Sequence, residues 1–117
     1  MNIQRMNTDR RMSQIVSYGG TIYLSGQVAD DTSGGVREQV RQVFAKIEAL
    51  LMRGGSGKEN ILAANIWLTT MADFEEMNKT WEEWLPTGAA PARATVEAKL
   101  VTPAHRVEIA VIAAVVR

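Results

Sequence analysis

The pattern of hydrophobic and polar positions in the first half of the chain predicts a β-hairpin followed by a helix. Residues 14–28 (QIVSYGGTIYLSGQV) contain two runs of β-branched and aromatic residues around a Gly-Gly pair, which is typical of two strands joined by a turn with positive φ. Residues 36–51 carry apolar side chains at helical spacing, and Gly54 and Gly55 end that pattern. We therefore expect two strands and then an amphipathic helix.

The second half of the chain alternates strand and helix patterns. Residues 61–70 (ILAANIWLTT) are rich in strand formers, and Asp73 begins a second helical pattern. Residues 94–100 alternate apolar and polar positions, and residues 107–116 are nearly all apolar. The last strand is therefore expected at the centre of a sheet. The apolar face of the second helix comprises Phe74, Met77, Trp81, Trp84 and Leu85.

Together these elements predict an α+β fold of order β-β-α-β-α-β-β, with a mixed sheet and two helices on one face. The last strand has a second apolar side, made of Ala110, Ile112, Ala114 and Val116. Because both helices lie on one face, the other face of the sheet lacks a cover. We expect that face to contact other copies of the chain.

The composition narrows the class of protein. A length of 117 residues fits one domain over residues 1–117. Thirteen basic and thirteen acidic residues cancel, so the long-range field that attracts nucleic acid or anionic lipid is missing. The chain has no cysteine, no signal-peptide pattern and no apolar stretch long enough to span a membrane. We expect a cytoplasmic protein that binds neither nucleic acid nor membrane.

Two motifs that suggest ligand chemistry are better explained by structure. Residues 54–59 (GGSGKE) resemble a phosphate-binding loop, but a helix precedes them, a strand follows, and Glu59 stands where such a loop has Ser or Thr. They are interpreted as a helix cap. The single histidine, His105, lies in a polar turn and has no cysteine or second histidine to complete a zinc site. No metal site is expected.

Three polar or small residues are candidates for ligand contact. Asn78 falls on the apolar face of the second helix, so its amide needs a partner, either a loop carbonyl or a ligand. Ser25 ends a strand beside Gly26, whose missing side chain would let a ligand approach the backbone. A plain turn at the end of a strand explains that pair equally well.

Arg93 and Glu108 are the strongest candidates. Arg93 sits among small residues in APARATVE, and an ordinary ion pair at a sheet edge would explain it. Glu108 lies in the apolar run VEIAVIAAVV, where an unpaired carboxylate would cost several kcal/mol, on the order estimated for buried charges. If residues 101–106 close a hairpin, the two lie roughly 17 Å apart on one sheet face. They could then share a pocket only if Glu108 came from a neighbouring subunit.

Four separated segments resemble the RidA (YjgF) family of imine deaminases, also called endoribonuclease L-PSP-like. They are YLSGQVA, FEEMNKTWEEW, APARATVEAKL and HRVEIAVIAAV, they occur in the family's order, and the resemblance covers nearly the whole chain. It implies a chorismate-mutase-like α+β domain that forms a homotrimer with ligand pockets between subunits, and a reaction without a metal or organic cofactor.

The resemblance also implies roles for individual residues. Arg93 matches the arginine that binds the carboxylate of a 2-imino acid, and Glu108 matches the glutamate that positions or activates the attacking water. Gly26 and Thr95 match positions where backbone groups line the ligand, and Asn78 matches a helix asparagine near the same cleft.

Two departures from the family pattern concern the substrate. Met12 stands where many deaminases have a tyrosine that contacts substrate, and Ala110 replaces the second glutamate of VEIE, so the chain resembles a divergent branch. Hydrolysis of 2-imino or 2-enamino acids, such as 2-aminoacrylate or 2-iminobutanoate, is the leading hypothesis. The alternatives are a non-catalytic trimer that binds small carboxylates or keto acids, and an endoribonuclease or translation inhibitor, which zero net charge argues against.

Overall fold

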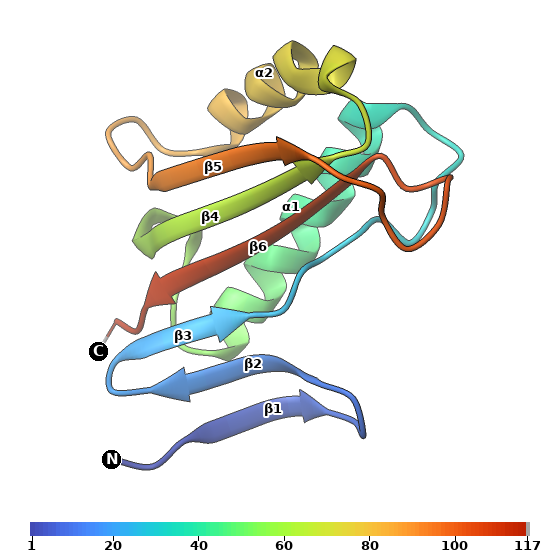
Figure 1. Ribbon diagram of the computed structural model, residues 1–117. Helices are drawn as coiled ribbons and strands as arrows, with labels where there is room; N and C mark the ends of the chain where they lie inside the picture. The colour runs from blue at the N-terminus through green and yellow to red at the C-terminus, as the bar shows by residue number, and fades with distance from the viewer. Residues whose placement is uncertain (117) are drawn as a thin grey trace.

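A single mixed sheet contains all six strands of residues 1–116, the part of the chain that the computed structural model describes (Figure 1). The strand order is β1-β2-β3-β6-β4-β5, and only β4 and β5 run parallel. The strands are β1 (Gln4–Thr8), β2 (Ser13–Tyr18), β3 (Thr21–Leu24), β4 (Ile61–Leu68), β5 (Ala92–Glu97) and β6 (Val107–Ala114). As predicted, the last strand is central, between β3 and β4.

Two helices cover one face of this sheet, which confirms the predicted α+β class. They are α1 (Val36–Arg53) and α2 (Phe74–Trp84); in Figure 1 α1 lies behind the sheet and α2 appears above β5. Gly54 and Gly55 follow α1; Gly55 has a φ of +85°, a conformation that suits glycine and ends the helix. Residues 54–59 are thus a helix cap and the connection into β4.

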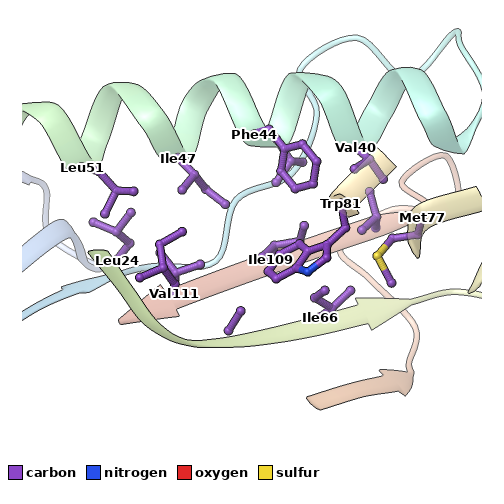
Figure 2. Close-up of a cluster of buried hydrophobic side chains, with 14 of the residues drawn as sticks. Leu24, Val40, Phe44, Ile47, Leu51, Ile66, Met77, Trp81, Ile109 and Val111 are labelled. Carbon is purple, nitrogen blue, oxygen red and sulfur yellow. The ribbon is translucent and has the colours of Figure 1, made fainter. Parts of the chain in front are cut away.

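The core lies between the sheet and the helices (Figure 2). One stripe of α1 is buried because its apolar residues recur at helical spacing, and every second residue of β6 faces that stripe. Each fully buried large apolar side chain stabilises the fold by about 1.5–3 kcal/mol relative to exposure. Residues in this cluster include Leu24, Val40, Phe44, Ile47, Leu51, Ile66, Met77, Trp81, Ile109 and Val111.

Strand β1 was not predicted. Its sequence, QRMNT, has no apolar alternation, and only Met6 packs partly against the core. The strand pairs with β2 alone, at the edge of the sheet. An edge strand of this kind is stabilised by backbone hydrogen bonds, which leave little trace in side-chain pattern.

The hairpin supposed between the last two strands is absent, because β5 and β6 do not pair. β5 spans Ala92–Glu97 instead of 94–100 and pairs in parallel with β4, while β6 pairs antiparallel with β3 and β4. In the sequence, helix α2 connects β4 to β5. It returns the chain from the end of β4 to the level where β4 begins, so β5 runs parallel to β4. The periodicity of a strand indicates its faces and does not specify its neighbours.

The sheet face opposite the helices has no covering element among the described residues (Figure 1). It carries half-buried Ala110, Ile112 and Ala114 from β6, exposed Tyr23 from β3 and exposed Val96 from β5. Val116 lies beyond β6 and is exposed. Arg117, the last residue of the predicted domain, lies outside the described residues. Within residues 1–116, neither helix is long and apolar enough to cross a membrane.

Candidate functional site

Arg93 lies on the helix-covered side of the sheet, one residue into β5. Its cross-strand partner is Ala64 on β4, which is buried in the core, so both residues point toward the helices. The short side chains Ala92 and Ala94 flank it on the strand. The long arginine side chain therefore crosses the edge of the core toward α2.

Helix α2 holds the guanidinium without neutralising it. Arg93 donates a hydrogen bond from Nη2 to Oδ1 of Asn78 at 2.7 Å, and its Cζ lies 5.4 Å and 5.9 Å from the ring centroids of Trp81 and Phe74. Both contacts stabilise a cation, the second through the negative faces of the rings. Burial lowers the pKa of Arg93, and attraction by the Glu82 carboxylate opposes that shift.

Arg93 forms no ion pair within the described residues. The edge ion pair considered for it is thus not present in residues 1–116. A guanidinium presents five N–H donors in a planar fork, and Asn78 takes one of them. The remaining donors are available to a carboxylate, which an arginine fork grips in bidentate fashion.

A cavity of about 520 Å³ opens beside Arg93, and we call it the Arg93 cavity. Its volume falls within the range of small-molecule sites. It lies between one side of α2 and the loop that leads to β5. Its lining comprises Glu75, Asn78, Trp81, Glu82, Leu85, Pro86, Thr87, Gly88, Ala90 and Arg93.

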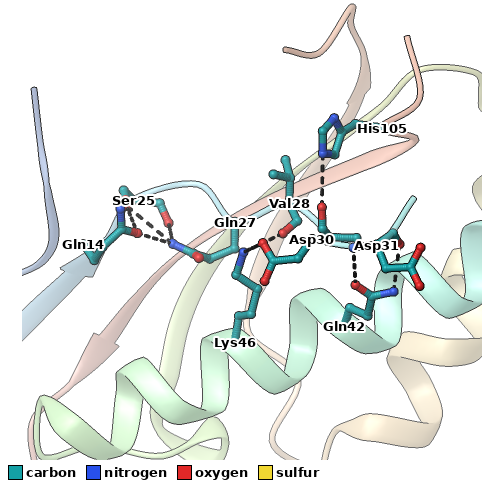
Figure 3. Close-up of polar contacts among 10 residues, drawn as sticks. Gln14, Ser25, Gln27, Val28, Asp30, Asp31, Gln42, Lys46 and His105 are labelled. Carbon is teal, nitrogen blue, oxygen red and sulfur yellow. Dashed lines mark hydrogen bonds and ion pairs between the residues drawn. The ribbon is translucent and has the colours of Figure 1, made fainter. Parts of the chain in front are cut away.

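A second group of predicted residues gathers where β3 ends. Gly26 lies against Glu108, so closely that a Cβ added to the glycine would overlap the carboxylate. Ser25 donates its hydroxyl to Oε1 of Gln14 at 2.8 Å, and Gln27 donates to the same oxygen at 2.7 Å (Figure 3). Gln27 also forms a backbone bridge with Ile109. These bonds fix the loop that carries Gly26 next to β6.

Glu108 points to the open face of the sheet. Its chain neighbours Val107 and Ile109 are buried under the helices, and alternation places Glu108 on the other side. It is half-buried, and within residues 1–116 it has no ion-pair partner. The cationic partner expected for this carboxylate is therefore missing from the described part of the chain.

Arg93 and Glu108 do not meet within one chain. Arg93 shares a row of the sheet with Ala64 and Val111, whereas Glu108 pairs with Trp67 three residues further along. At about 3.3 Å per residue and 4.8 Å per strand, their backbones are roughly 14 Å apart. Their side chains leave opposite faces of the sheet. The distance inferred from a hairpin on one face was thus based on the wrong pairing.

The remaining predicted residues divide between the two groups. Thr95 lies two residues after Arg93 on the same face, and its hydroxyl is buried without a hydrogen-bond partner among the described residues. Such a hydroxyl is uncommon and needs an acceptor or a water. Met12 lies in the β1–β2 turn, with 49% of its surface exposed, and donates its backbone N–H to Asp9. This turn is at the end of β2 that also carries Gln14.

No cluster of three potential metal ligands occurs in the part of the chain that the structure describes. His105 bonds Thr102 through Nδ1 at 2.7 Å. Through Nε2 it bonds the carbonyl of Ala29 at 3.1 Å (Figure 3). It is half-buried rather than fully solvated, and these bonds hold the loop before β6 against the loop before α1. Its role is structural.

Sequence reasoning missed two features of the Arg93 cavity. Phe74 and Trp81 were assigned to the apolar helix face, but both rings also lie beside the guanidinium, and Trp81 lines the cavity. Glu82 was not singled out, although it acts on Arg93. The sequence did contain a signal for the position of Glu82: it follows Asn78 by four residues, so both lie on one side of a helix.

Comparison with known proteins agrees with this architecture. The family model described as endoribonuclease L-PSP matches residues 2–115. A RutC family protein from Haemophilus ducreyi is 39% identical and covers 97% of each chain, and the RutC family protein YoaB from Escherichia coli K12 is 40% identical and covers 98% of this chain and 100% of its own. A crystal structure of a YjgF family member from Neisseria meningitidis superposes with a TM-score of 0.97 at 40% identity, covering 100% of this chain and 98% of that one.

Within residues 1–116, the fold and the site define a class of α+β proteins with one open sheet face and an arginine without an ion-pair partner beside a cavity. The chain belongs to the endoribonuclease L-PSP family, also known as the YjgF/RidA family.

Proposed function

We propose that this protein hydrolyses 2-imino acids and their enamine tautomers to 2-keto acids and ammonia. The observation that carries the proposal is the state of Arg93: a cation held in place by a neutral amide and two aromatic rings, without an ion-pair partner in residues 1–116, beside a 520 Å³ cavity. A small ligand with a carboxylate supplies the missing charge. A bidentate grip contributes about 1.5–3 kcal/mol per charged hydrogen bond.

The reaction needs a water, a group to position it and an anchored substrate. Water adds to the imine carbon to form a C–O bond, a proton passes to the nitrogen, and the C–N bond breaks to release ammonia and leave a ketone. Glu108 is the group that we assign to the water, as a hydrogen-bond acceptor and general base. No metal or organic cofactor is required by this scheme.

Because Arg93 and Glu108 leave opposite faces of one sheet, the proposed site combines two copies of the chain. The uncovered sheet face, with Ile112 and Tyr23, is the surface that we assign to this contact. Glu108, which has no ion-pair partner in residues 1–116, lies on it. We propose a homotrimer in which Arg93 of one copy and Glu108 of its neighbour line each pocket.

The first experiment measures catalysis directly. Imino acids are generated by an amino acid oxidase in the presence of the pure protein, and keto-acid formation is compared with the uncatalysed rate. Arg93→Ala is expected to abolish the acceleration, while Arg53→Ala, which removes an exposed arginine at the end of α1, retains it. Full activity in Arg93→Ala would refute the assignment.

A mixing experiment tests whether the site is shared. Arg93→Ala and Glu108→Gln are each expected to be inactive. After subunit exchange at equal amounts, a site between neighbours is intact only when one copy supplies Arg93 and the next supplies Glu108. In an equal mixture, each of these two conditions is met with a probability of one half. About one quarter of the sites are then intact, so about one quarter of the parental activity returns in a cyclic oligomer. A site within one chain would give no recovery.

A non-catalytic carboxylate binder is the second candidate, favoured by the residues at positions 12 and 110. Met12 and Ala110 offer no hydroxyl or carboxylate to a reacting ligand. Calorimetry that detects keto-acid binding dependent on Arg93, without imine turnover, would support this function. Cleavage of RNA, which the family description names, is tested with the same variants and is not expected because the chain has zero net charge.

A further inference from the structure

Helix α2 places a carboxylate on each side of the residue that holds Arg93. Glu75, Asn78 and Glu82 are separated by three and four residues, so they follow one side of the helix, and all three line the Arg93 cavity. At about 1.5 Å per residue, Glu75 lies about 4.5 Å from Asn78 along the helix axis, and Glu82 about 6 Å in the other direction.

These two carboxylates differ from their neighbours in sequence. In each Glu-Glu pair of FEEMNKTWEEW, the second glutamate faces α1: Arg37 forms ion pairs with Glu76 at 3.5 Å and with Glu83 at 2.6 Å. The first glutamate of each pair lines the cavity, and within the described residues neither Glu75 nor Glu82 forms an ion pair.

Lys79, the one basic residue of α2, does not neutralise either of these two glutamates through an ion pair among the described residues. Lys79 follows Glu75 by four residues, but it does not line the cavity and forms no ion pair within 4.0 Å among the described residues. The charged residues of the cavity lining are therefore Arg93 and two glutamates. A carboxylate bound to Arg93 would leave both glutamates without a counter-charge.

We propose that the Arg93 cavity prefers 2-imino acids whose side chain ends in an ammonium or guanidinium group. This rests on the proposed function, since it names the substrate class of the same site. A basic side chain of about five bonds extends roughly 6 Å, which matches the distance from Asn78 to Glu82 along α2. The aliphatic part of this side chain would lie along Trp81 and Leu85, while its charged end reaches the carboxylate of Glu82.

The test compares three imines that differ in the charge of their side chain. Imines made from arginine, norleucine and glutamate carry a positive, no and a negative side-chain charge, and each rate is divided by its uncatalysed rate. The parent is expected to favour the arginine imine over the norleucine imine by about tenfold in kcat/KM. Glu82→Gln should lower this ratio about three- to fivefold, as for the loss of one exposed ion pair, and the double variant with Glu75→Gln should remove it.

Glu83→Gln is the matched control. It removes the same charge from the same helix at the next residue, but on the side that faces Arg37. The ratio is expected to stay within about twofold of the parent. An equal fall in Glu82→Gln and Glu83→Gln would mean that overall charge, and not the cavity, sets the preference, and would overturn the inference.

The two proposals fail in different ways. If all three imines are hydrolysed with equal acceleration, the substrate preference is refuted and the deaminase activity stands. If none is hydrolysed, the deaminase activity is refuted, and calorimetry with 5-guanidino-2-oxopentanoate and 2-oxohexanoate decides the preference. The inference then holds only if the guanidino acid binds at least threefold more tightly and Glu82→Gln abolishes that difference.

Discussion

The contact between Gly26 and Glu108 gives a sharp test of the catalytic assignment through the substitution Gly26→Ala. A Cβ built on Gly26 would overlap Oε2 of Glu108 and lie 2.9 Å from Cδ and 3.2 Å from Cγ. The backbone of Gly26 is outside the positive-φ region, so alanine is compatible with its conformation. The added methyl therefore acts on the carboxylate and not on the local chain.

The size of the effect follows from these distances. Carbon atoms prefer a separation of about 3.5–4.0 Å, so the carboxyl carbon has to move by roughly 1 Å. The end of a glutamate side chain moves at little cost, and the free energy of unfolding should change by less than about 1 kcal/mol. A catalytic group displaced by about 1 Å can lose on the order of 100-fold in rate. Gly26→Ala is thus expected to be folded and strongly impaired.

The assay measures kcat/KM for imine hydrolysis together with unfolding by denaturant, for Gly26→Ala, Glu108→Gln and a matched control. Gly35→Ala adds the same methyl group at a point whose nearest neighbour is 3.9 Å away, on Arg106. This control is expected to lose some stability because Gly35 caps α1, but its rate should not change. Parental activity in a folded Gly26→Ala protein would show that the position of Glu108 does not matter for the reaction.

Three further substitutions test the site and the fold. Asn78→Asp should pair with Arg93 in place of the ligand and weaken carboxylate binding at least tenfold by calorimetry; unchanged affinity would contradict the role of the neutral amide. Asp73→Asn weakens the two bonds to Arg106, of 3.0 and 2.6 Å, and should lower the free energy of unfolding by about 1–3 kcal/mol, a loss that surface pairs rarely show. Ile109→Ala, at a fully buried position of β6, should cost about 2–5 kcal/mol in denaturant unfolding, and a cost below 1 kcal/mol would mean that this part of the core is loosely packed.

The sequence by itself determined the elements and their buried faces. The helical spacing of apolar residues located α1, the Gly-Gly pair located the turn between β2 and β3, and the apolar run of β6 indicated a central strand. These features are local, because the period of a helix or strand decides which side chains face the core. The residues around Arg93 and Glu108 made both candidates, and the resemblance of four segments to one family suggested their roles.

Only the tertiary structure decided which strands are neighbours and which faces the two candidate residues occupy. β5 pairs with β4 and not with β6, because α2 returns the chain to the level where β4 begins. This pairing puts Arg93 under α2 and Glu108 on the open face. Strand pairing joins residues far apart in the chain through backbone hydrogen bonds, which every residue type except proline can donate and accept. Side-chain pattern therefore carries little information about it, and the separation of the two residues became visible only in the folded chain.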